Sequence, residues 1–323
     1  MAHVGGHGLD VAGDGGGGQA ADDRRHVRPR PGHHDQGASH GPAAGGGRYP
    51  ADVPELPEVE AYRRLGERVV GRRVAQVVAP DTWYLKRGLT AAALAAAVEG
   101  RRLTAVRRTG KLLMYDTEHD GPVLGLRFGM SGRLVVDGAA GVDSLLYSSD
   151  QAVPPAQGAA RALARYDRFA LRFDDGSELV MRDPRRLGGV ELDPVEARLG
   201  PDALAVGPAA LARALAGSRA PLKARLLDQS RVAGVGNLAA DEALWRAGLD
   251  PTRPAGSLTP AELRRLHRHL RATMADLIAG GGSHSGELMA ERRPGGVCPR
   301  DGTPLLRRTV GGRTTWSCPR HQT

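Results

Sequence analysis

The run Pro54-Glu55-Leu56-Pro57-Glu58-Val59-Glu60 holds a residue pair that could act as a nucleophile and a proton carrier. A proline at the start of a chain is a secondary amine. It can attack an aldehyde carbon and form an iminium ion, because part of the amine is unprotonated at neutral pH. Glu55 would lie beside that amine and could move a proton. In the printed chain, however, Val53 acylates Pro54, and an amide nitrogen is not nucleophilic. The chemistry therefore requires an active protein that starts at Pro54.

Residues 1–53 are mainly Gly, His, Arg, Asp and Ala, with hardly an aliphatic side chain larger than Val. Such a stretch cannot bury enough apolar surface to offset its ordering entropy, so we expect it to be disordered. It lacks the apolar region of a secretory signal, and its Asp residues argue against an organelle transit peptide. We expect the codon of Val53 to be a non-AUG start codon that is read as Met, and this initiator Met to be removed. The upstream residues would then result from an error in the assigned gene start. The alternative is a genuine disordered tail before a structural Pro-rich turn.

Two turns could present side chains to a base stack. The first is Gly129-Met130-Ser131-Gly132, where the unbranched Met130 could leave the core and act as a wedge between base steps. A core methionine is the ordinary alternative. The second is Asp183-Pro184-Arg185-Arg186-Leu187-Gly188, which offers two guanidinium groups and Leu187 as a second wedge. Its alternative is a solvated basic turn.

Three further segments could meet phosphate groups. Lys111 begins a strand and could lie near the nucleophile, or it could be a solvated hairpin lysine. The glycines of Gly234-Val235-Gly236-Asn237 would let backbone amides and the next helix approach an anion, to which Asn237 adds a donor. An ordinary helix-connecting turn is the alternative. The basic segment 307–315, with Arg313 near its end, could lie against a DNA backbone.

The only two cysteines fall in the last 26 residues, which favours a local metal site of a cytosolic protein over a disulfide framework. Cys298-Pro-Arg-Asp301 and Cys318-Pro-Arg-His321 are separated by sixteen residues, which is the symmetric spacing of a zinc ribbon. The candidate ligands of one structural Zn²⁺ are therefore Cys298, Asp301, Cys318 and His321. The alternative is a metal-free hairpin in which the carboxylate and the imidazole are solvated.

Composition indicates a polyanionic partner. Of the net charge of +9, residues 1–53 contribute 5 Arg and 6 Asp, so the rest of the chain carries +10 and the whole has a pI near 10.2. Nucleic acid is the usual partner of such a protein, although an Arg-rich composition can also reflect a GC-rich genome. No apolar run approaches the roughly 18 residues of a membrane span.

The elements that must position these residues form an α+β multidomain chain. An amphipathic helix follows Pro57, and the short β-type runs 73–78, 102–108, 112–116, 123–128, 133–136, 169–173 and 178–181 predict a β-sandwich, interrupted by a helix at 91–98. Residues 137–165 look like a long surface loop. Helices are predicted at 209–216, 222–229, 239–247 and 260–279, the last with a Thr259–Glu262 capping box. We expect a catalytic sandwich domain at 54–192, a helical DNA-binding domain at 193–285 and a ribbon hairpin at 286–323.

Taken together, these motifs resemble the formamidopyrimidine-DNA glycosylase and endonuclease VIII family of helix-two-turn-helix base-excision enzymes. The similarity runs from Pro54 to the C-terminus in the same order, and Leu56 favours the formamidopyrimidine branch. It implies a bifunctional glycosylase and AP lyase in which Pro54 attacks C1′ of a damaged nucleotide. Glu55 would assist base departure and later proton transfers, and Lys111 would hold a phosphate. The implied DNA-binding residues are Met130, Arg185, Arg186, Asn237 and Arg313.

The chain departs from the family pattern in four places. It has Arg127 where His is usual, Leu187 where Phe is usual, and Asp301 and His321 where two cysteines are usual. The stretch 282–298 is also shorter than the loop that closes over the flipped base in 8-oxoguanine-specific relatives, so the preferred lesion stays open.

Three functions are compatible with these features. The first is the repair enzyme, acting as a monomer on damaged or abasic double-stranded DNA in the bacterial cytoplasm, at the nucleoid. The second is an inactive protein that binds damaged DNA. The third is an RNA- or ribosome-associated zinc-ribbon protein, which leaves Pro54 and Glu55 unexplained.

Overall fold

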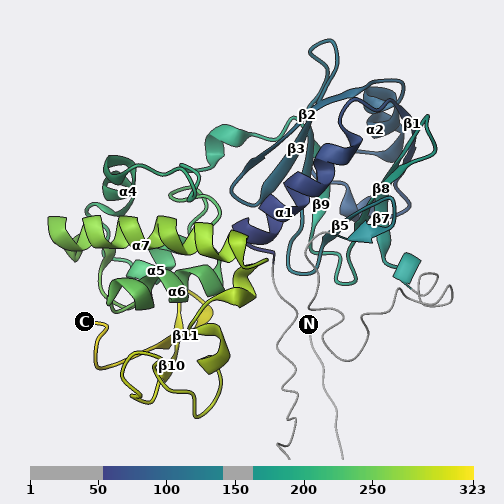
Figure 1. The fold of residues 1–323 in the computed structure, drawn as a ribbon. Coiled ribbons are helices and arrows are strands. Elements are labelled where there is room, and N and C mark those ends of the chain that lie inside the picture. Colours follow the sequence, from purple (N-terminus) through teal and green to yellow (C-terminus); the bar gives the residue numbers. More distant parts are fainter. Residues whose placement is uncertain (1–53, 141–162) are drawn as a thin grey trace, which may run out of the picture. The chain divides into compact units, whose positions relative to one another are not determined.

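The computed structural model describes residues 54–140 and 163–323 (Figure 1). The expectations for residues 1–53, and for most of the loop predicted at 137–165, lie outside these ranges. The described elements comprise an N-terminal β-sandwich with two helices, a helical region, and a C-terminal hairpin.

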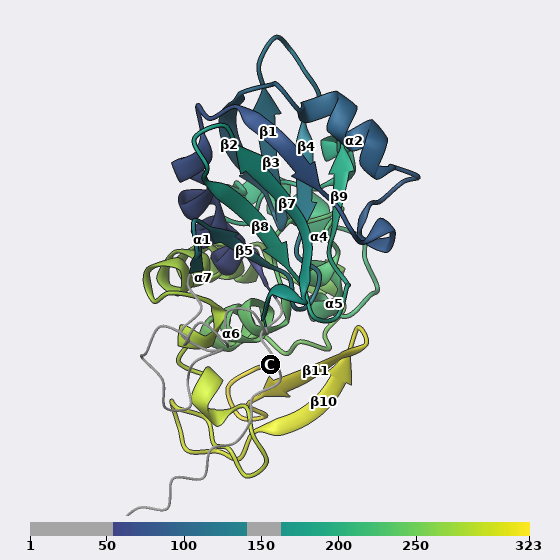
Figure 2. The same cartoon turned by 90° about the vertical axis from the view of Figure 1, so that its right-hand side faces the viewer.

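The sandwich consists of two antiparallel sheets. One has the strand order β1-β7-β8-β5-β6 and the other the order β2-β3-β4-β9, so the chain alternates between the sheets as it proceeds. In Figure 2 the two sheets lie one behind the other. Their strands are β1 (Val74–Val78), β2 (Leu103–Thr109), β3 (Leu112–Thr117), β4 (Leu124–Arg127), β5 (Arg133–Val136), β6 (Ala139–Ala140), β7 (Asp167–Phe173), β8 (Glu178–Arg182) and β9 (Gly189–Leu192).

Apolar side chains from both sheets and from helix α1 (Leu56–Gly66) form the sandwich core. Strand residues Tyr115 and Phe169 are fully or almost fully buried, as is Val59 on the helix. The ring of Tyr62 stacks on Phe128 with centroids 4.6 Å apart. Burial of such side chains is the main force holding the helix on the sheet. The start of α1 is thereby fixed, and with it the Pro-Glu pair.

Four helices build a second apolar core: α4 (Pro208–Leu215), α5 (Leu222–Leu227), α6 (Asn237–Ala247) and α7 (Pro260–Ala279). Helix α7 begins with the predicted capping box, in which Thr259 Oγ1 accepts from Glu262 N and Glu262 Oε2 accepts from Thr259 N. Leu56, the first residue of α1, belongs to this core. One helix thus contributes to both cores.

The C-terminal hairpin pairs β10 (Leu306–Val310) with β11 (Arg313–Ser317). A small core of its own includes Trp245 from α6, Leu288, Trp316 and both cysteines. Among the described residues there are also the helix α2 (Ala91–Val98) and the short 3-10 helices η1 (Glu67–Val69), η2 (Thr82–Tyr84), η3 (Glu196–Arg198), η4 (Ala255–Ser257), η5 (Ser283–Ser285) and η6 (Met289–Glu291).

The predicted fold class is confirmed, and each of the seven predicted β runs corresponds to a strand. Strands β6 and β9 were not predicted: β6 has two residues, and β9 has four and follows a turn directly. The predicted helix at 222–229 was too long, because the chain leaves the helical conformation at Asp228. The proposed boundaries between three domains, after residues 192 and 285, stay predictions.

Candidate functional site

The Pro-Glu pair lies where α1 meets the turn before α6. Leu56 N donates to Gly234 O at 3.3 Å. The Glu55 carboxylate accepts from the first amides of α6, with Oε1 2.8 Å from Leu238 N and Oε2 3.0 Å from Ala239 N. A carboxylate is favoured at a helix N-terminus because the amides there lack partners within the helix and carry partial positive charge. Two segments far apart in sequence thus meet at Glu55.

The glycines of the 234–237 turn allow this contact. A Cβ on Gly236 would lie 2.0 Å from Glu55 Cδ, and one on Gly234 would lie 2.5 Å from Leu56 Cδ1. Gly234 also has a φ of 103°, which disfavours a side chain. The hypothesis that these glycines bring the helix amides to a phosphate therefore needs correction, because the anion at the start of α6 is Glu55 of the same chain.

Lys111 approaches the same place from the β2–β3 hairpin. Gly110 packs so tightly on the turn that an added Cβ would lie 2.7 Å from Ala233 Cβ. The half-buried Lys111 ammonium makes no hydrogen bond within the described residues. Burial raises the pKa of the Glu55 carboxyl, against the lowering effect of Lys111. Burial lowers the pKa of Lys111, and the positive charge of Arg313 lowers it further. The negative charges of Glu55 and Glu58 act in the other direction. Burial therefore disfavours the charged form of both Glu55 and Lys111.

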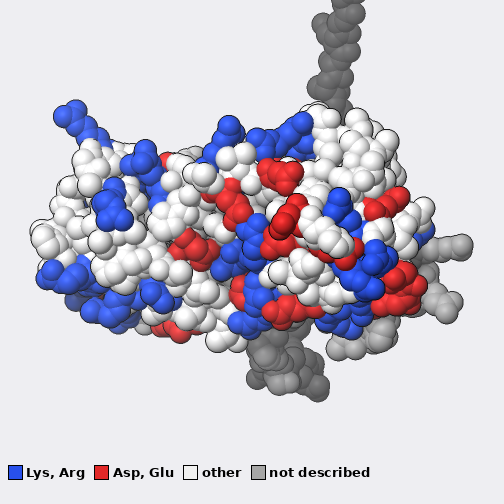
Figure 3. Space-filling model, turned by 90° about the horizontal axis from the view of Figure 1, so that it is seen from above, with Lys and Arg blue, Asp and Glu red and all other residues white. Residues whose placement is uncertain are grey.

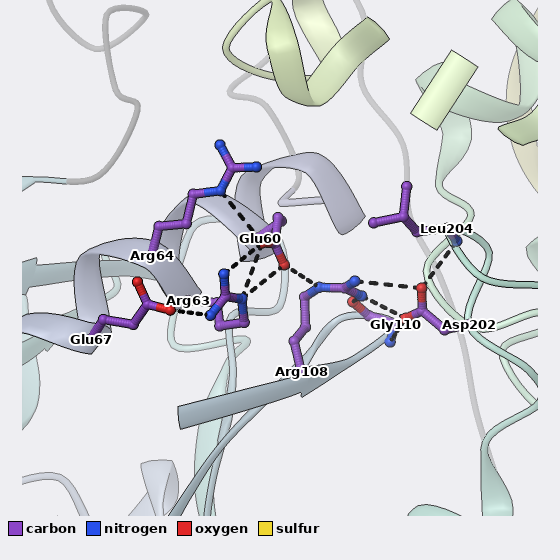
Figure 4. Close-up of polar contacts among 8 residues, drawn as sticks. All are labelled: Glu60, Arg63, Arg64, Glu67, Arg108, Gly110, Asp202 and Leu204. Carbon is purple, nitrogen blue, oxygen red and sulfur yellow. Dashed lines mark hydrogen bonds and ion pairs between the residues drawn. The ribbon is translucent and has the colours of Figure 1, made fainter. Parts of the chain in front are cut away.

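Arg108 holds this hairpin against α1 (Figure 4). Its side chain is 6% exposed and donates to Glu60 Oε2 at 3.0 Å and to Asp202 Oδ2 at 2.6 Å. Asp202 Oδ2 also accepts from Gly110 N at 2.7 Å. Burial alone would raise the pKa of Glu60, but hydrogen bonds from Arg63 and Arg108 lower it. Arg108 therefore neutralises two carboxylates and sets the position of the segment that carries Lys111.

We expect Arg108→Met to lower the free energy of unfolding by about 3–5 kcal/mol, because it leaves Glu60 and Asp202 without their shared cation. Arg64→Met is the matched control, since Arg64 also contacts Glu60 but its side chain is 59% exposed. The control should change stability by less than about 1 kcal/mol. Urea unfolding near neutral pH measures both variants, and equal losses would contradict the role given to Arg108.

The two predicted wedge turns lie side by side and share one buried carboxylate. Asp183 is fully buried and accepts from Ser131 Oγ in the first turn and from Gly188 N, at 2.8 Å, in the second. Met130 is half-buried and belongs to neither large core, so the alternative of a core methionine was wrong. Leu187 is 49% exposed. The fold thus presents two apolar side chains from adjacent turns.

The two arginines of the second turn differ. Arg186 forms a bidentate ion pair with Asp81, through Nε to Oδ2 at 2.6 Å and Nη2 to Oδ1 at 2.5 Å. This hydrogen-bonded carboxylate has a lowered pKa. The exposed Arg185 side chain has no ion pair within the described residues. That Arg186 contacts DNA stays a prediction, and in this structure its guanidinium is paired with Asp81.

Asn237 and Arg313 complete the predicted phosphate ligands. Asn237 Oδ1 is buried and has no hydrogen-bond partner within the described residues. Arg313 is exposed at the start of β11, and its positive charge contributes to the lowered pKa of Lys111. The fully buried Lys223 holds the adjacent residue, since Nζ lies 3.1 Å from Thr314 O and 2.7 Å from Asp241 Oδ1. These contacts fix the hairpin on α5 and α6.

The four predicted metal ligands come together, with their ligand atoms within 4.8 Å of one another. His321 Nδ1 lies 3.5 Å from Cys298 Sγ and 3.4 Å from Asp301 Oδ2, which suits a tetrahedral ion. Hydrogen bonds from neighbouring groups also orient two of the candidate ligands. His321 Nε2 is 3.2 Å from Trp245 O, where it can donate and leave Nδ1 free, and Trp245 Nε1 donates to Cys298 Sγ at 3.3 Å. The residues therefore fit a bound metal ion.

Three buried carboxylates hold the short segment that follows α7. They belong to α1 and α6 and bind it at three places along its length. Ser283 N donates to Glu58 Oε1 at 2.5 Å, Leu288 N to Glu242 Oε2 at 2.9 Å, and Arg292 pairs with Asp241. We infer that this segment is a fixed part of the site.

Four residues that hold the site together were not predicted from the sequence: Glu58, Arg108, Asp183 and Lys223. Glu58 alone has a local signal, since it stands three residues after Glu55 and accepts from Glu55 N at 2.9 Å. The others have partners 50 or more positions away, so no local pattern reveals them.

The charge distribution is uneven on the face shown in Figure 3. Acidic side chains lie among the basic ones over its middle and right, whereas most charged side chains at its left end are basic. Several arginines are neutralised within the fold, among them Arg63, Arg107, Arg108, Arg182, Arg186 and Arg246. These pairs leave the net charge unchanged, so the basic excess of the chain belongs to side chains outside them. Among the described residues, no helix is long and apolar enough to cross a membrane.

Comparisons with known proteins match both the sequence and the fold. Residues 53–190 match the family model described as the formamidopyrimidine-DNA glycosylase N-terminal domain, and residues 199–287 match the H2TH domain of the same glycosylase. The formamidopyrimidine-DNA glycosylase of Paracoccus denitrificans is 38% identical over 295 residues, covering 83% of this chain and 99% of that protein. The crystal structure of MutM (Fpg) from Thermus thermophilus has a TM-score of 0.65 at 36% identity, covering 83% of this chain and 98% of that one. A Lactococcus lactis Fpg complex with abasic-site DNA shares the fold, with a TM-score of 0.67 at 24% identity and coverage of 84% and 100%.

Proposed function

Because the chain belongs to the formamidopyrimidine-DNA glycosylase family, we propose that it excises oxidised bases from DNA and cleaves the abasic strand, with Pro54 as nucleophile. The observation that carries this proposal is the position of Glu55, whose carboxylate is desolvated, bound by α6 and adjacent to Pro54 and Lys111. Borohydride trapping, described in the Discussion, tests it. The alternative of an inactive damage-binding protein is not favoured by the family match.

The chemistry follows from the two residues. The amine of Pro54 attacks C1′ as the bond to the damaged base breaks, and the departing base takes up a proton. Opening of the sugar ring gives an iminium ion between the proline nitrogen and C1′. The iminium acidifies the 2′ proton, whose removal expels the 3′ phosphate and cuts the strand, and water then releases the enzyme. Glu55 assists these proton transfers, since burial keeps its pKa above the ordinary value for a carboxyl.

The other residues hold the DNA. Lys111 and Arg313 offer an ammonium and a guanidinium, and Asn237 offers its side-chain NH2 group at the start of α6. Such donors suit the phosphates around an everted nucleotide. Met130 and Arg185, on the two joined turns, would fill the space that the nucleotide leaves. Lesion-containing duplex DNA is the partner, and one lesion needs one site, so we propose that the protein acts as a monomer. It would work where chromosomal DNA lies, at the nucleoid in the bacterial cytoplasm.

We propose that the enzyme is not restricted to 8-oxoguanine. The segment that follows α7 is short, and Glu58, Asp241 and Glu242 hold it in place. Such a segment is poorly suited to closing over one particular base. Formamidopyrimidines and oxidised pyrimidines should therefore be excised at rates comparable with that of 8-oxoguanine. Excision kinetics on duplexes that carry each lesion would test this, and a strong preference for 8-oxoguanine would contradict it.

We propose that the ion held by Cys298, Asp301, Cys318 and His321 is Zn²⁺, because two thiolates, one imidazole and one carboxylate form a ligand set that zinc accepts. When bound, it would act structurally by joining the two ends of the hairpin. The hairpin carries Arg313, so the ion would support DNA binding at a distance from the chemistry.

Chelation of the metal should weaken binding to an abasic-site duplex by about tenfold or more, because the loss of ribbon order removes the Arg313 contact. The emission of Trp245 should change in parallel, since its indole N–H donates to Cys298 Sγ. Tryptophan fluorescence and metal analysis after chelator treatment measure both, and re-addition of Zn²⁺ is the control. If the metal leaves while emission and affinity stay constant, the ribbon does not depend on the ion.

A further inference from the structure

Trp83 is the exposed tryptophan of this chain. Its side chain is 68% exposed, whereas Trp245 and Trp316 are 1% and 6% exposed, and these three are all the tryptophans in the sequence. Among the described residues, Trp83 is also the most exposed of the large hydrophobic side chains. Water contact over most of an indole is unfavourable relative to burial, and an exposed aromatic ring of this kind often marks a binding surface.

The backbone that carries Trp83 is fixed. Trp83 N donates to Asp81 Oδ1 at 3.1 Å, which caps the short helix η2. The next residue, Tyr84, is fully buried, and Lys86 N donates to Val190 O at 2.8 Å. The Trp83 indole is therefore exposed although the backbone on both sides of it is held in place by hydrogen bonds and burial.

The helix η2 packs directly on the turn that carries Leu187. Asp81, which caps η2, is the carboxylate that binds Arg186 of that turn. A Cβ on Gly188 would lie 2.5 Å from Tyr84 Oη. Trp83 and Leu187 are thus exposed apolar side chains on two elements in direct contact.

The charges around Trp83 favour a polyanion. Lys86 Nζ lies 5.5 Å from the centre of the Trp83 ring, within the range of a cation–π contact. Arg185, on the adjacent turn, has no ion pair within the described part of the chain. An exposed aromatic ring beside a lysine ammonium is an arrangement on which proteins stack nucleic acid bases.

We propose that Trp83 stacks on a base of the bound DNA beside the lesion and supplies aromatic surface that Leu187 does not offer. This inference rests on the proposed function, because it takes damaged duplex DNA as the partner. In this arrangement Met130 and Leu187 act as aliphatic wedges, and Trp83 holds a neighbouring base after the stack opens.

Acrylamide quenching of tryptophan fluorescence tests the contact directly. Without DNA, the accessible part of the emission should come from Trp83 and should vanish in Trp83→Phe, since the other two tryptophans are buried. On saturation with a duplex that carries a stable abasic-site analogue, the quenching constant of the wild type should fall by about threefold or more as the indole becomes covered. Anisotropy of a labelled duplex reports binding independently of tryptophan.

Affinity measurements show whether the ring matters for binding. Trp83→Ala should weaken binding to the lesion duplex about tenfold, and Trp83→Phe should stay within about threefold of the wild type, because phenylalanine keeps a stacking ring. Val195→Ala, which truncates another exposed apolar side chain, is the control and should leave affinity unchanged. Thermal melting should show that all three variants fold.

Two outcomes would overturn the inference in different ways. If the duplex binds by anisotropy while the quenching constant stays constant, or if Trp83→Ala binds as tightly as the wild type, Trp83 does not contact DNA although the proposed function stands. If neither damaged nor intact duplex binds at all, the proposed function fails and the role of Trp83 fails with it.

Discussion

Sodium borohydride should trap a covalent complex between abasic-site DNA and a chain whose first residue is Pro54, and none with a chain in which Val53 precedes it. Only a proline with a free amine can form the reducible iminium, so the expected difference is complete. In the structure Pro54 is buried where α1 meets α6, and the neighbouring Glu55 is held by Leu238 N, so the amine would lie beside its proton carrier. Gel analysis of the trapped complex gives the result.

Both forms should be tested for binding as well as trapping. The form that starts at Pro54 and the full printed chain share Lys111, Arg185 and Arg313, so affinity for an abasic-site analogue measures whether the longer form folds and binds. Trapping by the full chain would contradict the assignment of Pro54 as nucleophile. If neither form is trapped although both bind tightly, the protein is a damage-binding protein without catalysis.

Replacing Glu55 with Gln should reduce base excision by about 10²- to 10⁴-fold, the usual contribution of a positioned proton carrier. The amide has nearly the same shape as the carboxyl but cannot exchange the proton. Binding of an abasic-site analogue should change little, because the phosphate-binding residues are untouched. Single-turnover excision and duplex affinity separate these effects. A variant that keeps full excision would place the proton transfers on another group.

Although Glu55→Gln should reduce activity, it should raise the stability of the folded protein. Burial raises the pKa of Glu55 above its ordinary value, so folding favours the protonated form. The stabilisation from that proton is complete below about pH 4.5 and is lost as pH rises through the folded-state pKa. Glu55→Gln mimics the protonated form, so its melting temperature should exceed that of the wild type increasingly as pH rises from about 5. Melting curves across this range measure the difference, and a constant difference would contradict the raised pKa.

The sequence predicted the elements well wherever the signal was local. The capping box at Thr259 and the apolar spacing behind Pro57 give correct helix starts, because both depend on residues within one or two turns. The cysteine spacing likewise predicted correctly that Cys298, Asp301, Cys318 and His321 lie together. Each of these patterns depends on interactions between residues close in sequence, and these interactions can be predicted without knowing the fold.

The roles of Arg186 and the 234–237 turn could not be predicted in this way. An arginine in a basic turn looks available for DNA, and only the fold brings Asp81, 105 positions away, to neutralise it. The glycines of the turn look like a phosphate cradle, and only the docking of α1 shows that Glu55 fills the space. In both cases a distant carboxylate of the same chain occupies a place that sequence reasoning assigned to a phosphate.

The contact between Glu55 and α6 also orders events during synthesis on the ribosome. Glu55 is made among the first residues of the sandwich, but its amide partner at Leu238 is 183 positions later. At roughly 5–20 residues per second, the two are separated by about 10 to 40 seconds of translation. During that interval a nascent chain that begins at Pro54 carries its amine without the organised carboxylate beside it. Proton transfer by an oriented Glu55 therefore becomes available only after the helical region has been synthesised.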